Sequence, residues 1–171
     1  MRVIGGKFRG KKLDYVSNEM TRPTKDIVRE SIFNIIGQKV RDTIVLDLFA
    51  GCGSMGIEAI SRGATHVTFN DIDGVAIATL KKNLSLLGVG NYKITRHDYT
   101  AYLGSREQTF DIVFLDPPYD FSVDPRLFGS VLNPGGIIVY ETQKILPDLP
   151  RKTYGKTNVY IITKSDTEST V

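Results

Sequence analysis

The feature that most constrains this fold is a pair of short apolar stretches with almost no polar residue. They are residues 43–48 and 110–115, and a turn rich in glycine or proline follows each of them. Continuous apolar strands are typical of parallel sheets, in which both faces are covered. Segments with helical periodicity, such as 74–87, alternate with the strands and predict right-handed βαβ units. We therefore expect an α/β fold with a mostly parallel sheet and helices on both faces.

Weaker signals predict the remaining elements. Apolar periodicity indicates helices that begin near residues 24, 55 and 125. Further strands are expected at 67–69, 92–95 and 137–141, with an antiparallel hairpin over 152–163. Residues 1–16 are expected to form a β-hairpin, with apolar ends at 3–4 and 13–16 and with Gly5, Gly6 and Gly10 between them. Residues 165–171 are expected to be frayed.

One domain accounts for a chain of this size. It has 171 residues, 41% of them hydrophobic, which is enough for a core of its own. The apolar runs are too short to span a membrane. One cysteine, Cys52, and two histidines, His66 and His97, rule out a Cys/His zinc cluster, so we expect no metal. We expect a monomer in the reducing cytoplasm.

Positive charge is concentrated at the start of the chain. Residues 1–25 have a formal charge of +5, whereas the remainder has −2. A basic segment beside a near-neutral domain is typical of proteins that bind nucleic acids. A solvated edge hairpin protected by lysines is the alternative. We expect residues 1–23 to form a basic hairpin arm and link that project from a catalytic domain at 24–171, and to bind RNA through Arg2, Lys7, Arg9, Lys11, Lys12 and Arg22.

A glycine-rich loop follows the first apolar strand. The segment Asp47-Leu-Phe-Ala-Gly51-Cys-Gly53-Ser-Met-Gly56 contains G-x-G-x-x-G and opens a helix. Glycine lets the backbone approach a ligand closely, because no side chain intervenes. This pattern fits a dinucleotide site, an S-adenosylmethionine site, or a tight turn without a ligand.

Acidic residues near this loop bear on the choice of ligand. Asp71 follows the second strand, where a carboxylate accepts hydrogen bonds from ribose hydroxyls, and Asp73 is better explained as a helix N-cap. Asp47 ends the buried first strand and would repel the pyrophosphate of a nicotinamide cofactor. It is compatible with the positively charged methionine part of S-adenosylmethionine, or with a role in holding loop amides.

The sharpest signal ends the strand at 110–115. Asp116, Pro117, Pro118 and Tyr119 follow it directly. The prolines lack N–H donors, so the turn presents mainly acceptors: a carboxylate and backbone carbonyls. Such a pocket suits a planar amine, and the tyrosine ring can stack on a nucleobase.

Together these motifs resemble the class I, S-adenosylmethionine-dependent amino-methyltransferases. Their order along the chain is that of the group that methylates guanine amines. Other segments are similar to the RsmD family, and the similarity runs from residue 1 to about residue 141. They are Arg2-Val-Ile-Gly-Gly-Lys-Phe-Arg-Gly10, Arg22-Pro-Thr24, Val28-Arg-Glu-Ser-Ile-Phe-Asn34 and Ser61-Arg-Gly63.

The resemblance implies a fold, a reaction and roles for residues. It implies a single Rossmann-like domain with a seven-stranded sheet, six strands parallel and one reversed. The activity implied is methylation of the exocyclic amine of one guanine in small-subunit (16S) ribosomal RNA, within the assembled or assembling subunit. By resemblance, Asp47, Phe49, Gly51 and Gly53 hold the methionine end of the cofactor, Asp71 the ribose and Asp98 the adenine amine, while Asp116, Pro117, Pro118 and Tyr119 hold the target amine.

The chain departs from the family pattern at three places. Cys52 replaces a usual serine, Asp71 replaces a longer glutamate, and the segment 121–134 is short. The shortened segment flanks the expected base pocket, so the departures bear more on the target base than on the cofactor. For Asp98, a loop cap is an equal alternative.

Three other functions fit parts of the sequence. An adenine or cytosine amino-methyltransferase acting on DNA or another RNA would share the Asp-Pro-Pro-Tyr motif, but DNA enzymes usually carry a recognition insertion. A nicotinamide-dependent reductase would leave that motif unexplained. A non-catalytic RNA-binding assembly factor would not need Asp116 together with Gly51 and Gly53.

Overall fold

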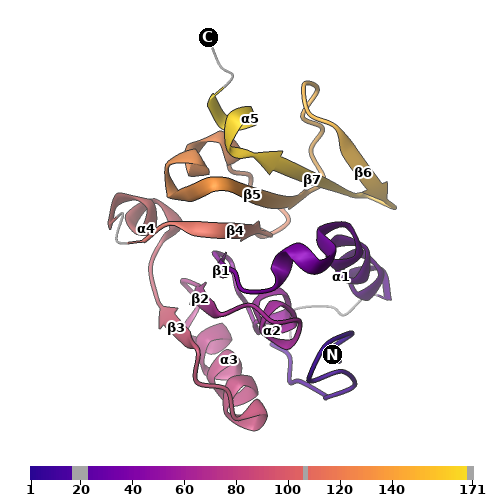
Figure 1. Cartoon of the computed structure of the whole chain (residues 1–171), viewed down its shortest axis with the longest axis vertical. Helices are drawn as coiled ribbons and strands as arrows, with labels where there is room; N and C mark the ends of the chain where they lie inside the picture. The colour runs from indigo at the N-terminus through magenta and orange to yellow at the C-terminus, as the bar shows by residue number, and fades with distance from the viewer. Residues whose placement is uncertain (17–22, 106–107, 169–171) are drawn as a thin grey trace.

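The computed structural model describes residues 1–16, 23–105 and 108–168. They form one seven-stranded sheet in the order β3-β2-β1-β4-β5-β7-β6 (Figure 1). The strands are β1 (Ile44–Asp47), β2 (His66–Asn70), β3 (Tyr92–Thr95), β4 (Phe110–Leu115), β5 (Leu132–Thr142), β6 (Arg151–Tyr154) and β7 (Thr157–Thr163). The α-helices are α1 (Pro23–Ile36), α2 (Ser54–Ser61), α3 (Gly74–Leu87), α4 (Tyr99–Ser105) and α5 (Lys164–Glu168), and two 3-10 helices span Gly37–Val40 and Pro125–Val131.

Strand directions agree with the expected sheet. The neighbours among β3, β2, β1, β4 and β5 pair in parallel. Strand β7 is antiparallel to β5, and β6 is antiparallel to β7, so β7 alone is reversed. The α/β class and the mostly parallel, class I arrangement are therefore confirmed.

Alternation along the strands creates two cores. In β4, Ile112 and Phe114 join the core beneath α1, α2 and α3, whereas Val113 and Leu115 join the core on the other face. These four side chains are at most 2% exposed, because a parallel strand is covered on both faces. The described part of the chain contains no helix with both the length and the apolar character needed to cross a membrane.

Several element predictions need correction. Residues 164–168 form α5 instead of a frayed end, and α4 was not predicted at all. The helix expected at 125–132 is a 3-10 helix, with Pro125 at its first turn. Strand β5 begins at Leu132, five residues before its predicted start, because the bulged pairing with β4 starts there.

The basic N-terminal segment does not project from the body. Residues 1–13 fold into a tight loop with one isolated bridge between Arg2 and Lys12, and not into a regular hairpin. Val3 and Leu13 are 3% and 5% exposed, within the core beneath α1 and α2. We call residues 1–13 the N-terminal loop. Its apolar ends anchor it to the body of the protein.

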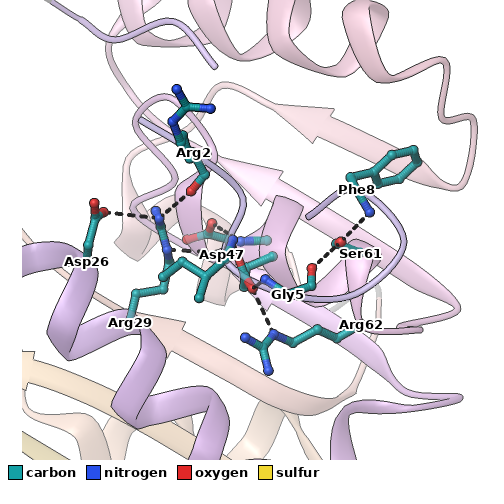
Figure 2. Close-up of polar contacts among 11 residues, drawn as sticks. Arg2, Gly5, Phe8, Asp26, Arg29, Asp47, Ser61 and Arg62 are labelled. Atoms are coloured by element: carbon teal, nitrogen blue, oxygen red, sulfur yellow. Dashed lines mark hydrogen bonds and ion pairs between the residues drawn. The ribbon is translucent and has the colours of Figure 1, made fainter. Parts of the chain in front are cut away.

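Backbone hydrogen bonds attach the middle of the N-terminal loop to α2. The Ile4 and Gly5 amides donate to the two oxygens of the buried Glu58 carboxylate, at 2.9 and 2.8 Å. The Phe8 amide donates to Ser61 Oγ at 2.9 Å, and that hydroxyl donates to the Gly5 carbonyl at 2.6 Å (Figure 2). A side chain at Gly6 would collide with the Ser61 carbonyl, with Cβ at 1.9 Å, so the close approach requires glycine.

Candidate active site

A cleft of about 820 Å³ opens at the carboxyl ends of β1, β2 and β4. This is the position at which open parallel sheets bind ligands. It brings together nine of the ten residues predicted for cofactor or target amine. They are Asp47, Phe49, Gly51, Asp71, Asp98, Asp116, Pro117, Pro118 and Tyr119.

The tenth residue, Gly53, serves the packing of the loop. It has a φ of +91° and lies outside the lining of the cleft. A Cβ at this position would lie 2.4 Å from Leu80 Cδ1 of α3. Gly51, with a φ of +54°, does line the cleft. Gly51 therefore borders the cleft and Gly53 packs closely against α3, while the contact of Gly53 with the cofactor stays a prediction.

Asp47 ties the glycine-rich loop to the end of β1. Its side chain is buried, and Oδ2 accepts a hydrogen bond from the Gly56 amide at 2.9 Å. This is one of the two roles that the sequence left open. The same carboxylate also lines the cleft, where a methionine amino group would meet it.

The carboxylate of Asp71 is held in a defined orientation. Oδ2 accepts from the Gly51 amide at 2.8 Å, and Oδ1 accepts from the Asp73 amide at 2.9 Å. Each oxygen retains further acceptor capacity for ribose hydroxyls. Asp73 accepts from the Val75 amide at 2.9 Å, which confirms it as the N-cap of α3.

Asn70 is a site residue that the sequence reasoning did not single out. It is 1% exposed, and its amide nitrogen donates to the Leu48 and His97 carbonyls at 3.2 and 3.0 Å. Its oxygen accepts from the Thr95 hydroxyl at 2.8 Å. The side chain thus joins the ends of β1, β2 and β3. The sequence feature that could have pointed to Asn70 is its position as a polar residue at the end of an apolar strand.

Asp98 lies at the rim of the cleft and caps α4. It is exposed and accepts hydrogen bonds from the amide and the hydroxyl of Thr100. These bonds lower the pKa of the Asp98 carboxyl. Asp98 therefore caps α4, as one of the two predicted roles required, and it also borders the cleft where adenine is predicted to bind.

Three aromatic rings form one wall of the cleft. The ring centroids of Tyr99 and Phe121 lie 5.4 Å apart. The ring centroid of Phe49 lies 5.9 Å from that of Tyr99 and 6.3 Å from that of Phe121. Tyr99 and Phe121 were not predicted as site residues, because nothing in the sequence around them is periodic. Their flat apolar surfaces suit a purine ring.

The Asp-Pro-Pro-Tyr turn has the expected acceptor character. Pro117 is buried, and the Pro118 carbonyl accepts from the Phe121 amide at 2.9 Å. Asp116 is half-buried, and burial raises the pKa of its carboxyl. Tyr119 is 79% exposed, so its ring faces solvent instead of the core. A rigid turn around a core tyrosine is thereby excluded.

Most of the predicted RNA-contacting cations are exposed on the N-terminal loop. Lys7, Arg9, Lys11 and Lys12 present their side chains to solvent. Arg2 donates to the Gly10 carbonyl at 3.2 Å, and its own carbonyl accepts from Arg29 at 2.7 Å, so it also shapes the loop (Figure 2). Arg22 lies outside the described residues.

Among the described residues, no group of three or more His, Cys, Asp or Glu side chains is arranged to hold a metal ion.

Comparisons with known proteins agree with the geometry. The chain is 40% identical over 183 residues to the Bacillus subtilis protein YlbH, covering 96% of this chain and 99% of that one. It is 36% identical over 156 residues to ribosomal RNA small subunit methyltransferase D of Haemophilus influenzae, covering 86% and 81% of the two chains.

Solved structures of methyltransferases are also similar to this chain. The Escherichia coli protein yhhF superimposes with a TM-score of 0.84 at 30% identity, covering 95% of this chain and 97% of that one. The Thermus thermophilus 16S rRNA guanine-N2 methyltransferase RsmC, in complex with AdoMet and guanosine, shares the fold with a TM-score of 0.68 at 22% identity, covering 90% of this chain and 45% of that one. The family described as Conserved hypothetical protein 95 matches residues 1–163, so the chain belongs to this family, the RsmD family.

Proposed function

We propose that this protein transfers a methyl group from S-adenosylmethionine to the exocyclic amine of a guanine in small-subunit (16S) ribosomal RNA. The observation that carries the proposal is the position of the Asp116-Pro117-Pro118-Tyr119 turn. It opens into the same cleft as Gly51 and the oriented Asp71 carboxylate. The relatives named ribosomal RNA small subunit methyltransferase D support the choice of substrate.

The residues in the cleft fit S-adenosylmethionine better than a dinucleotide. Five carboxylates border it among the described residues, Asp47, Asp71, Asp98, Asp116 and Asp120, against a single lysine, Lys25. A pyrophosphate would be repelled there. S-adenosylmethionine supplies an electrophilic methyl group on a sulfonium when it is bound, and the sulfonium and amino charges are compatible with these carboxylates.

The Asp116–Tyr119 turn can make the guanine amine, a weak nucleophile, react with the methyl group. The lone pair of a guanine amine is delocalised into the ring. Acceptors at Asp116 and the Pro117 carbonyl hold its two N–H groups and favour a pyramidal nitrogen. Most of the acceleration then comes from orientation and electrostatics. The base must leave its stack, and stacking on Tyr119 offsets part of that cost. We propose that the protein acts as a monomer in the cytoplasm, where small subunits assemble.

Cofactor choice is directly testable. We expect S-adenosylmethionine to bind and NAD to show no measurable heat of binding, because the cleft has carboxylates where a pyrophosphate would lie. Isothermal titration calorimetry of the full chain with each compound measures this. Tighter binding of NAD than of S-adenosylmethionine would contradict the proposal.

The substrate is tested with labelled S-adenosylmethionine. Small subunits from cells that lack this activity, naked 16S RNA and duplex DNA are incubated separately with the enzyme. We expect label in the small subunit, recovered as N2-methylguanosine after digestion to nucleosides. Label recovered as a methylated adenine or cytosine would favour the alternative amino-methyltransferase, and binding without transfer would favour the assembly factor.

The N-terminal loop is expected to contact RNA phosphates. Neutralising four exposed cations to glutamine should weaken binding to small subunits and flatten its salt dependence, by roughly 0.7–0.9 in log–log slope per lost phosphate contact. Folding and cofactor affinity should persist, because these side chains lie outside the core. The positions are Lys7, Arg9, Lys11 and Lys12. Superimposable plots of affinity against salt for wild type and variant would indicate a merely solvated loop.

A further inference from the structure

Two carboxyl side chains lie next to each other at the ends of β4 and β5. Leu115 pairs with Tyr140 across these strands, so the following residues, Asp116 and Glu141, are neighbours in register. Residues two positions earlier, Phe114 and Val139, pack into the core beneath α1 and α2. Side chains two positions apart share a face, so both carboxyls belong to the face that α1 covers.

Helix α1 brings cations to this pair. Lys25 and Arg29 line a crevice of about 50 Å³ together with Asp116 and Glu141. Lys25 and Asp116 also line the main cleft, so together with Ser54 and Met55 they border both spaces. Sequence reasoning counted Lys25 only toward the charge of the N-terminal region, and Glu141 was not singled out.

Burial and like charge oppose ionisation of both carboxyls. Burial raises the pKa of Asp116, and Lys25 lowers it. Burial, and then the charge of Asp116, raise the pKa of Glu141 well above its usual range. Two adjacent carboxyls titrate as a coupled pair, and the larger rise belongs to Glu141, so Asp116 is the carboxyl of the pair that ionises more readily. Lys25 is the cation that acts on both groups.

We propose that Lys25, at the crevice that it shares with Asp116 and Glu141, is a positioning residue for methyl transfer, which favours the carboxylate form of Asp116 so that Asp116 can accept a hydrogen bond from the target amine. This assignment rests on the proposed function. It separates Lys25 from the cations that contact phosphate, although all of them come from the same basic stretch of sequence.

The proton balance shows why the charge on Asp116 matters. Transfer forms a nitrogen–carbon bond and breaks the carbon–sulfur bond, whose electron pair stays on sulfur. The amine nitrogen then holds one proton too many, and an Asp116 oxygen can accept that proton only if the carboxyl is ionised. Protonated Asp116 would present a donor to an amine that is itself a donor.

Titratable and charged groups from several elements face the carboxyl pair. Those on the crevice or acting on the pair from neighbouring elements are the Met1 amino group, Tyr15, Lys25, Asp26, Arg29, Asp47 and Cys52. Asp26 is paired with Arg29 at 3.1 Å, which reduces the effect of that guanidinium on the carboxyl pair. Lys25 is the cation shared with the cleft.

The test is the pH dependence of single-turnover methyl transfer in Lys25→Met. Loss of the cation raises the pKa of Asp116, so the fall in rate on the acid side should move to higher pH, by at least about half a pH unit. Lys25→Arg should restore the wild-type profile because it keeps the charge. Lys39→Met, an exposed lysine of the 3-10 helix at Gly37–Val40, is the matched control and should leave the profile unchanged.

A phosphate-binding role for Lys25 predicts a different result. The pH profile would stay in place, while affinity for small subunits and its salt dependence would fall, and that outcome would overturn the assignment. A second readout does not need catalysis: carboxyl-carbon NMR of the full chain should show the Asp116 titration at higher pH in Lys25→Met than in wild type. An unchanged Asp116 titration overturns the inference even if methyl transfer is confirmed, and a shifted one supports it even if the RNA substrate is wrong.

Discussion

Replacing Asp116 by alanine is expected to slow methyl transfer by about a hundredfold or more, the usual loss when one oriented electrostatic partner is removed. The carboxylate borders the cleft at the end of β4, where it is half-buried and acts on charge more strongly than in water. Single-turnover transfer from labelled S-adenosylmethionine to small subunits measures the effect. Because the residues proposed to bind the cofactor lie at the ends of β1, β2 and β3, the affinity for the cofactor should change much less.

Asp116→Asn gives the matched comparison. The amide keeps the shape of the side chain but loses its charge and replaces one acceptor with a donor. We expect it to be nearly as slow as the alanine variant, with cofactor affinity near that of wild type by calorimetry. Turnover close to wild type in both variants would show that Asp116 does not hold the amine.

Replacing Glu58 by alanine is expected to cost about 3–5 kcal/mol in free energy of unfolding, as when one partner of a buried ion pair is removed. Its carboxylate is 1% exposed, pairs with Arg62 at 2.7 Å and with Arg29 at 3.9 Å, and accepts the Ile4 and Gly5 amides. The variant leaves two guanidinium groups and two half-buried amides without this acceptor. Urea denaturation measures the loss.

Glu30→Ala provides the control for this stability change. Glu30 is exposed on α1, so its removal should alter the unfolding free energy by roughly 0.5 kcal/mol or less. In Glu58→Ala, hydrogen exchange at the Ile4 and Gly5 amides should also become faster, because the N-terminal loop loses its main anchor. Equal urea midpoints for Glu58→Ala and wild type would contradict this account of how the loop is held.

The regular elements could be predicted where apolar pattern and boundary residues agree. Strand β4 has the expected limits because it is a continuous apolar run that ends just before a proline pair. Helix α3 has the expected limits because it lies between the Asp73 N-cap and Gly88. Helix α4 could not be predicted. It has seven residues and includes Gly104, so its own propensity is low, and it forms where Asp98 caps it and Tyr102 and Leu103 pack on the second core.

The sequence by itself determined the fold class and the chemistry of the cleft. Polar residues that directly follow buried parallel strands must gather at one edge of the sheet, so Asp47, Asp71 and Asp116 could be placed there from their positions in the chain. Only the tertiary structure decided how residues outside that pattern are used. Gly53 packs on α3, the N-terminal loop lies on α2, and Lys25 lines the same crevice as the carboxyl pair at the ends of β4 and β5. The physical reason is that these contacts join segments far apart in sequence, and no local propensity or periodicity encodes which distant surface a loop or a helix end will meet.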